Sequence, residues 1–275
     1  MDKKAKIQLD KFQFNAEPDE SRSGGFCQLF RGSCPDGKPI VAKVLKSRLT
    51  WRVEAKSFAK EASIANRLQE LSTKLFPIKA IAELQYFTPE VRDPGHPWFK
   101  LPVLIWEDIA GPTLSEWMSV NRPTLVEAVF ITKQIAQILA AAHELGFAHR
   151  DVKPSNVIML NGELSPVIID WGIGAFTGDS AVWRYLEPPT GTLLYMSPEQ
   201  MCNEDGAVPY RSDCYSLGII FYQLLTGVHP FADRLGWSQE MHAGVFKGRQ
   251  PEGIKLDEWE RLISATITRR TAVTE

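Results

Sequence analysis

Apolar and polar residues alternate along the first third of the chain with the two-residue period that is typical of β-strands. The alternation begins at Phe12 and Phe14, resumes at 26–31 after a Gly/Ser-rich stretch, and leads to an apolar run at 39–45. The sequence CPDG at 34–37 separates the last two segments and predicts a hairpin turn. This part of the chain therefore predicts β-strands joined by turns.

Apolar residues recur with helical spacing in three segments. Residues 52–72 predict a helix with one apolar face. The residues of that face are Phe58, Ala62, Ala65 and Leu68. A longer periodic segment at 124–145 ends at Gly146, a residue suited to a helix C-cap, and a third apolar helix is predicted at 213–225.

Short strands and loops fill other stretches. Two strand-like runs lie on either side of a Pro/Gly loop at 88–97, and two short strands at 156–160 and 166–170 flank a turn. Residues 171–198 are rich in Gly, Pro and Thr and predict a long loop, which in a compact domain is usually functional or disordered. A β-rich first third is thus followed by a mostly helical remainder.

The length of the chain predicts two lobes. Its 275 residues exceed the usual size of one hydrophobic core. We expect an α+β fold with a small β-rich N-terminal lobe at 11–107, a hinge at 108–111 and a larger, mostly helical C-terminal lobe at 112–275. Residues 1–10 predict a polar tail.

The charge and apolar content of the chain indicate which classes of binding partner to expect. The formal net charge of -2 gives no argument for nucleic acid or an anionic membrane, and the longest apolar stretch, near 217–225, is too short to span a bilayer. We therefore expect neither partner. None of the four cysteines forms a CxxC pair, which favours reduced thiols and a cytoplasmic location. The oligomeric state stays open.

Two short motifs supply the residue types that phosphoryl transfer needs. HRDVKPSN occupies residues 149–156, and DWG occupies 170–172. Phosphoryl transfer requires a carboxylate that orients the attacking hydroxyl, a cation beside the phosphates and oxygen ligands for Mg²⁺. Asp151 can be the carboxylate and Lys153 the cation. The side chains of Asn156 and Asp170 offer hard oxygen ligands suited to magnesium.

Together these motifs resemble the eukaryotic-type protein kinase family, most closely its serine/threonine kinases, and the resemblance covers about residues 12–270. It implies transfer of the γ-phosphoryl group of ATP to Ser or Thr hydroxyls of protein substrates, with ATP and Mg²⁺ (Mn²⁺ is an alternative) bound between two lobes. It implies catalytic roles for Asp151 and Lys153, and metal binding by Asn156 and Asp170.

In the N-terminal lobe, the sequence VAKV at 41–44 resembles the family's third strand. The resemblance implies that Lys43 binds the phosphates of ATP and pairs with Glu61 of the following helix. It also implies a set of nucleotide-binding residues. They are Gly24, Gly25, Leu29 and Ala42, together with Glu107 and Ile109, whose backbone groups would face adenine.

The glycine-rich loop departs from the family pattern GxGxxGxV. Aligned on Lys43, residues 22–29 keep the central glycine, Gly24, but place Arg22 and Cys27 where glycines usually allow close backbone approach. A plain hairpin turn is an alternative for this stretch. Nucleotide affinity is expected to differ from that of a typical member.

The segment GTLLYMSPE at 191–199 resembles the end of an activation segment. The resemblance implies that Thr192 lies beside the catalytic residues, that Glu199 pairs with Arg269, and that Asp213 holds the backbone of the catalytic loop. An ordinary helix N-cap is an alternative for this aspartate.

Arg150 precedes the catalytic aspartate, and kinases with that arginine commonly pair it with a phosphorylated residue of the activation loop. The alternative is that the guanidinium bonds only backbone or the local acids Asp179 and Glu187. We expect autophosphorylation at one of four candidates in the loop. They are Thr177, Ser180, Tyr185 and Thr190.

Two tryptophans replace residues that the family usually has. Trp171 stands where phenylalanine is usual, and Ala65 stands where a larger aliphatic residue is common, so the two changes are expected to compensate in volume. Trp106 falls at the gate behind the nucleotide site, where its bulk would exclude inhibitors that use a back pocket.

Two other functions are compatible with parts of this pattern. A catalytically weak scaffold or nucleotide-binding protein of the same fold is favoured by the altered glycine loop. A small-molecule kinase is opposed by the segment at 191–199. Lys153 and Thr192 are the types that serine/threonine kinases carry, but dual specificity stays open, as do the substrate and the activator.

Overall fold

The computed structural model describes ten stretches of the chain, namely residues 6–19, 27–45, 58–59, 61–69, 81–160, 162–171, 175–176, 194–197, 200 and 209–230. The chain divides into two compact units, Met1–Ile109 and Ala110–Glu275. Each unit has its own secondary structure and is described separately.

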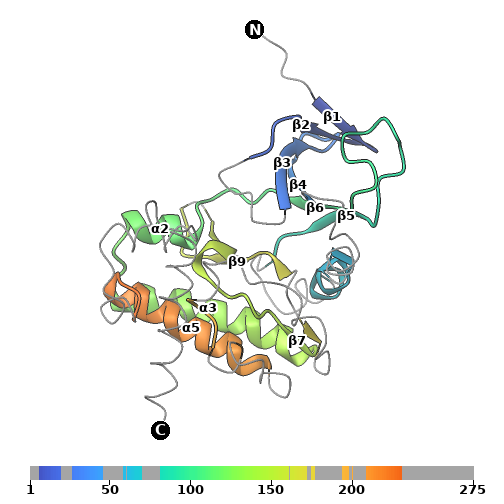
Figure 1. Ribbon diagram of the computed structural model, residues 1–275. Helices are drawn as coiled ribbons and strands as arrows, with labels where there is room; N and C mark the ends of the chain where they lie inside the picture. Colours follow the sequence, from blue (N-terminus) through green and yellow to red (C-terminus); the bar gives the residue numbers. More distant parts are fainter. Residues whose placement is uncertain are drawn as a thin grey trace, which may run out of the picture. The chain divides into compact units, whose positions relative to one another are not determined.

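The N-terminal unit is built on a six-stranded antiparallel sheet with the order β1-β2-β3-β4-β6-β5 (Figure 1). Its strands are β1 Lys6–Leu9, β2 Phe12–Asn15, β3 Cys27–Ser33, β4 Pro39–Leu45, β5 Leu84–Thr88 and β6 Val103–Glu107. The predicted turn at 34–37 is confirmed, because the Gly37 amide donates to the Cys34 carbonyl at 2.9 Å. Gly37 has a φ of 84°, a conformation that glycine adopts without strain.

The prediction of a polar tail at 1–10 is wrong for residues 6–10. Strand β1 pairs with β2 as a hairpin, and Asp10 at the turn has a φ of 52°. Ile7 and Leu9 are buried. Ile7 and Leu9 repeat the two-residue spacing of Phe12 and Phe14, but the turn at 10–11 shifts the phase by one position. Their burial outweighs the basic character of the first residues.

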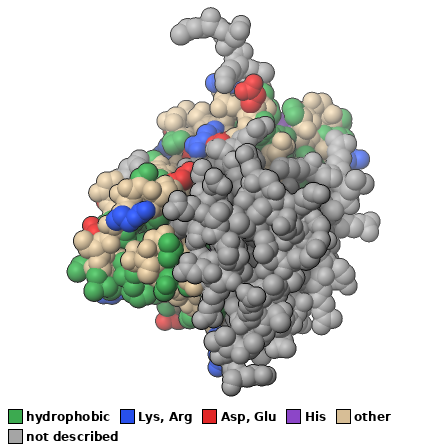
Figure 2. Space-filling model, turned by 60° about the vertical axis from the view of Figure 1, so that its left-hand side comes forward, with side chains coloured by type: hydrophobic (Ala, Val, Ile, Leu, Met, Phe, Trp, Pro, Cys, Tyr) green, Lys and Arg blue, Asp and Glu red, His purple; other side chains and the backbone are tan. Residues whose placement is uncertain are grey.

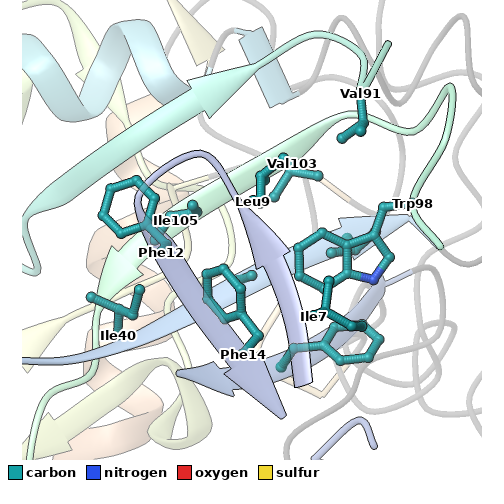
Figure 3. Packing of buried hydrophobic residues seen from close by; sticks show 12 residues of the cluster. Ile7, Leu9, Phe12, Phe14, Ile40, Val91, Trp98, Val103 and Ile105 are labelled. Carbon is teal, nitrogen blue, oxygen red and sulfur yellow. The ribbon is translucent and has the colours of Figure 1, made fainter. Parts of the chain in front are cut away.

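One apolar cluster packs on a face of this sheet (Figure 3). Trp98, from the segment between β5 and β6, is buried with its ring centroid 5.3 Å from that of Phe14 and 4.9 Å from that of Phe30. The segment therefore acts as a cover for the sheet. Its position is fixed further by His96, whose Nε2 lies 2.9 Å from the carbonyl oxygen of Gln8 on β1.

Residues 58–59 and 61–69 of the N-terminal unit are helical, within the predicted helix at 52–72. All four residues of the predicted apolar face are buried, as are Glu61 and Ile64. Glu61 is the one charged residue among these buried side chains. A buried carboxylate needs a compensating partner.

The C-terminal unit is mostly helical. Its long helices, α3 Leu125–Glu144 and α5 Pro209–Thr226, pack side by side (Figure 1). Its shorter elements are α2 Leu114–Val120, β7 Phe147–Ala148, the 3₁₀ turn Pro154–Asn156, β8 Val157–Met159, β9 Pro166–Ile168 and β10 Ala175–Phe176. The helix predicted at 124–145 and the strand pair predicted around the turn at 161–162 are confirmed. Helix α5 begins one turn earlier than predicted.

Capping boxes begin both α2 and α3. Thr113 and Glu116 exchange side chain-to-backbone hydrogen bonds at the start of α2, and Thr124 and Glu127 do so at the start of α3. The backbone amide of Thr124 donates to Glu127 and thereby lowers the pKa of that carboxyl. Helix α2 was not predicted, although the Thr-x-x-Glu pattern marks its start in the sequence.

Helix α3 is long and apolar enough to cross a membrane by length and composition. One of its faces, which includes Ile131, Ile135 and Leu139, is buried within the unit, where α3 packs on α5, β7 and β9. Other apolar residues near its start, such as Val126 and Phe130, are exposed. Figure 2 shows apolar side chains at the surface of the described part of the chain. The buried face is that of a core helix.

Trp98→Ala should lower the free energy of unfolding by about 3–5 kcal/mol, because it removes a buried indole and leaves a cavity beside two phenylalanine rings. Urea unfolding followed by circular dichroism measures this change. Phe130→Ala is the control, because its side chain is half exposed on α3, and its effect should stay within about 0.5 kcal/mol. Equal effects of the two substitutions would contradict the packing described for Trp98.

Candidate active site

In the N-terminal unit, the structure brings Lys43 and Glu61 together as the sequence predicts. The Lys43 ammonium lies 3.2 Å from Glu61 Oε1 and 2.9 Å from Oε2. The glutamate side chain is only 1% exposed and that of the lysine 16% exposed. A buried carboxylate is costly unless a cation and hydrogen bonds compensate it, so this pair fixes the lysine beneath the sheet.

The register of the sheet defines which residues share a face with Lys43. Leu29 lies directly opposite Lys43, and Arg31 lies opposite Val41, so these four side chains point to one side of β3 and β4. Ala42 points to the other side and is fully buried in the apolar cluster of Figure 3.

The prediction that Ala42 contacts the nucleotide together with Lys43 is therefore wrong. Side chains alternate along a strand, so two consecutive residues cannot line the same face. Val41 is the residue of β4 that accompanies Lys43. The period of the strand alone could have identified it.

The end of β6 leads into the predicted hinge. Trp106 lies opposite Val41 of β4, on the face that carries Lys43, and is buried. The Glu107 amide donates to the Glu83 carbonyl at 2.9 Å, and the Asp108 amide donates to the Pro39 carbonyl at 3.1 Å. Ile109 is buried. The backbone that was predicted to face adenine is thus held by neighbouring strands and loops of the same unit.

Arg31 was not predicted as a site residue, yet it forms ion pairs with acidic residues from two different segments of the N-terminal unit. Its guanidinium forms ion pairs with Asp19, at 2.8 Å, and with Asp108. The hydrogen bond to Asp19 is the main cause of a raised pKa of Arg31. The Asp19 amide also donates to the Leu29 carbonyl at 2.7 Å. Arg31 thereby links the hinge to the strand that leads from the glycine-rich segment.

In the C-terminal unit, a buried carboxylate organises the catalytic loop. Asp213 of α5 accepts hydrogen bonds from the backbone amides of His149, at 2.8 Å, and Arg150, at 2.7 Å. His143 Nε2 lies 2.8 Å from the same carboxylate. Because α5 begins at Pro209, Asp213 lies inside the helix, and the alternative of an N-cap aspartate is wrong.

His149 connects the two motifs. Its Nε2 lies 3.1 Å from the Ile169 carbonyl, and its Nδ1 accepts from the Asp151 amide at 3.2 Å. Its ring also packs on Trp171, with centroids 4.7 Å apart, and Trp171 is almost fully buried. Ala65 is fully buried in the N-terminal unit. Compensation between Trp171 and Ala65 stays a prediction.

The structure brings Asp151, Lys153 and Asn156 together. Asp151 Oδ2 accepts from Lys153 Nζ at 2.7 Å and from Asn156 Nδ2 at 3.0 Å. The other oxygen, Oδ1, is buried and has no hydrogen-bond partner among the described residues. Two donors thus fix the carboxylate and leave one oxygen available to a hydroxyl.

Asn156 and Asp170 fit a magnesium ion by their chemistry. The amide nitrogen of Asn156 makes the contacts to Asp151, which directs the amide oxygen elsewhere. The Ile169 amide donates to the Asn156 carbonyl at 3.0 Å and so ties the residue before Asp170 to the catalytic loop. Amide and carboxylate oxygens are the hard ligands that Mg²⁺ prefers. Within the described residues, no cluster of three or more His, Cys, Asp or Glu side chains forms a separate metal site.

Several predicted residues lie outside the described part of the chain. They are Gly24, Gly25, Thr177, Ser180, Tyr185, Thr190, Thr192, Glu199 and Arg269. Their roles stay predictions. Arg150 is described, and it is buried with a φ of 64°.

The fold and these two groups of residues define the protein kinase class. Residues 23–267 match the family model of the protein kinase domain. The chain therefore belongs to the protein kinase family and has its two-lobed α+β fold.

Similar proteins are bacterial serine/threonine-protein kinases. PkaA of Streptomyces coelicolor is 38% identical over 135 residues, which cover 48% of this chain and 24% of PkaA. PknB of Mycobacterium leprae is 36% identical over 132 residues, 48% of this chain and 21% of PknB. Pkn1 of Myxococcus xanthus is 33% identical over 202 residues, 72% of this chain and 26% of Pkn1. The chain thus matches about a quarter of the length of these relatives.

Proposed function

We propose that this chain transfers the γ-phosphoryl group of ATP to serine or threonine hydroxyls of proteins. The observation that carries the proposal is the Asp151 carboxylate, which is held by Lys153 and Asn156 through Oδ2 and keeps a buried Oδ1 for a substrate. The similarity to serine/threonine-protein kinases supports the class of substrate. Lys153 is also the residue type that serine/threonine kinases carry.

In the proposed reaction, the substrate hydroxyl approaches Asp151 Oδ1, which orients it and accepts its proton. The hydroxyl oxygen forms the new bond to the γ-phosphorus, and the bond from that phosphorus to the bridging oxygen of ADP breaks. The Lys153 ammonium, 2.7 Å from Oδ2, lies close enough to offset negative charge near the hydroxyl.

The nucleotide would be held by Lys43, whose ammonium is fixed by Glu61. The Glu107 carbonyl and the Ile109 amide are proposed to contact adenine, with Leu29 and Val41 beside them on the Lys43 face of the sheet. Asn156 and Asp170 would hold Mg²⁺, or Mn²⁺. The ion would supply positive charge to the phosphates. The proposal thus assigns one task to each of these groups.

Regulation by autophosphorylation is also proposed. Arg150 directly precedes the catalytic aspartate, and its guanidinium could bind a phosphate on Thr177, Ser180, Tyr185 or Thr190. A cytoplasmic location is proposed from the cysteine usage alone. Protein substrates are the only partners that the proposal requires.

Asp151→Asn should abolish phosphoryl transfer but leave ATP binding nearly unchanged, because the carboxylate acts on the hydroxyl and not on the nucleotide. Transfer from labelled ATP to a generic protein substrate in the presence of Mg²⁺ measures the first effect, and calorimetric titration with ATP measures the second. Lys43→Ala is the matched comparison, since it should weaken nucleotide positioning. Near-wild-type turnover of Asp151→Asn would refute the assignment.

Incubation of the wild-type chain with Mg-ATP should place phosphate within residues 177–190 and raise activity several-fold, because the new phosphate can pair with Arg150. Mass spectrometry maps the sites, and phosphatase treatment should reverse the gain. The Asp151→Asn chain is the control for transfer by a contaminating kinase. An unmodified loop in a fully active sample would contradict this mechanism.

A further inference from the structure

The backbone of Arg150 is held from both sides by side chains of other elements. Its amide donates to Asp213 Oδ1 at 2.7 Å, and its carbonyl accepts from Gln200 Nε2 at 2.9 Å. Its φ of 64° lies in the left-handed region, which is strained for a residue that has a side chain. A strained residue persists only where its surroundings hold it in place.

Gln200 is itself fixed by a local cap. The Ser197 amide donates to Gln200 Oε1 at 3.2 Å, and the Gln200 amide donates to Ser197 Oγ at 3.3 Å. The Ser197 hydroxyl also donates to Ser212 Oγ of α5 at 3.0 Å, and both serines are fully buried. Gln200 therefore has a defined orientation, with its oxygen used by the cap and its nitrogen directed at the catalytic loop.

The Arg150 carbonyl belongs to the peptide bond that enters Asp151. Rotation of that peptide would turn the Asp151 side chain away from Lys153 and Asn156. Asp213 holds only the amide of Arg150, on the other side of its α-carbon, so it leaves this rotation unopposed. Two hydrogen bonds restrain this peptide among the described residues. Its N–H, the Asp151 amide, donates to His149 Nδ1 at 3.2 Å within the catalytic loop, and its carbonyl accepts from Gln200 Nε2, the partner that lies outside the loop.

We propose that Gln200 is a positioning residue for phosphoryl transfer, which acts by holding the Arg150–Asp151 peptide. This inference rests on the proposed function. It implies that Gln200 supports the orientation of the catalytic carboxylate directly, through its side-chain amide.

Gln200→Glu separates the two tasks of this side chain. The carboxylate keeps an oxygen that can accept from the Ser197 amide, so the cap survives, but it has no N–H to donate to the Arg150 carbonyl. Ser197→Ala is the matched control. It removes the hydroxyl that accepts from the Gln200 backbone amide but keeps the Gln200 side-chain amide, which donates to the Arg150 carbonyl. A role in local folding alone would make the second substitution at least as harmful as the first.

The test measures kcat, KM for ATP, thermal unfolding and hydrogen–deuterium exchange of the peptide that contains residues 149–152 in full-length variants. For Gln200→Glu we expect kcat to fall roughly 10- to 100-fold, the size of effect that a small misplacement of a catalytic group produces. KM for ATP and the unfolding temperature should stay close to wild type, and exchange in the catalytic loop should be faster.

An unchanged kcat or unchanged exchange in Gln200→Glu would overturn the inference. A loss of kcat that Ser197→Ala reproduces in full, together with a lower unfolding temperature, would also overturn it. In that case Ser197 and Gln200 would act only by stabilising the local fold. If the wild-type chain transfers no phosphate, the proposed function fails. In that case exchange alone shows whether Gln200 holds the loop, and an unaltered rate rejects the positioning role.

Discussion

The hydrogen bonds to the buried carboxylate of Asp213 are the constraint on which the described catalytic loop depends. This side chain is fully buried in α5, where an uncompensated charge would cost several kcal/mol. The amides of His149 and Arg150 compensate it, together with the ring of His143 from α3. The same contacts that make the charge tolerable thus attach the loop to the two long helices. Asp151 and its partners are built on that attachment.

Much of the fold could be predicted because its signals are local. The apolar run of β4 and the glycine that follows α3 each lie within a few residues and correspond to real elements. The hairpin strand β1 was missed because the basic residues around Ile7 and Leu9 concealed its apolar period. Ala42 was misplaced by analogy, where the period of the strand already favoured Val41.

The supporting contacts could not be predicted from the sequence, because they join residues that are distant along the chain. Arg31 and Asp108 are 77 residues apart, and Gln200 and Arg150 are 50 residues apart. An isolated arginine or glutamine carries no signal of its partner. By contrast, the residues of HRDVKPSN contact one another across short separations, so the motif already contains most of its own geometry. Lys43 and Glu61 are 18 residues apart, and their pairing was predicted only because the family pattern indicated it.

The most direct test of this account is the turnover of Asp213→Asn, measured with its unfolding temperature and its affinity for ATP. The substituted amide keeps the shape of the carboxylate but replaces one acceptor with a donor that faces a backbone amide. We expect kcat to fall at least tenfold, with ATP affinity retained and a moderate loss of stability, of about 1–3 kcal/mol. The exposed Asp93 serves as the control when changed to Asn. An Asp213→Asn chain with wild-type kcat would show that the catalytic loop does not depend on this carboxylate.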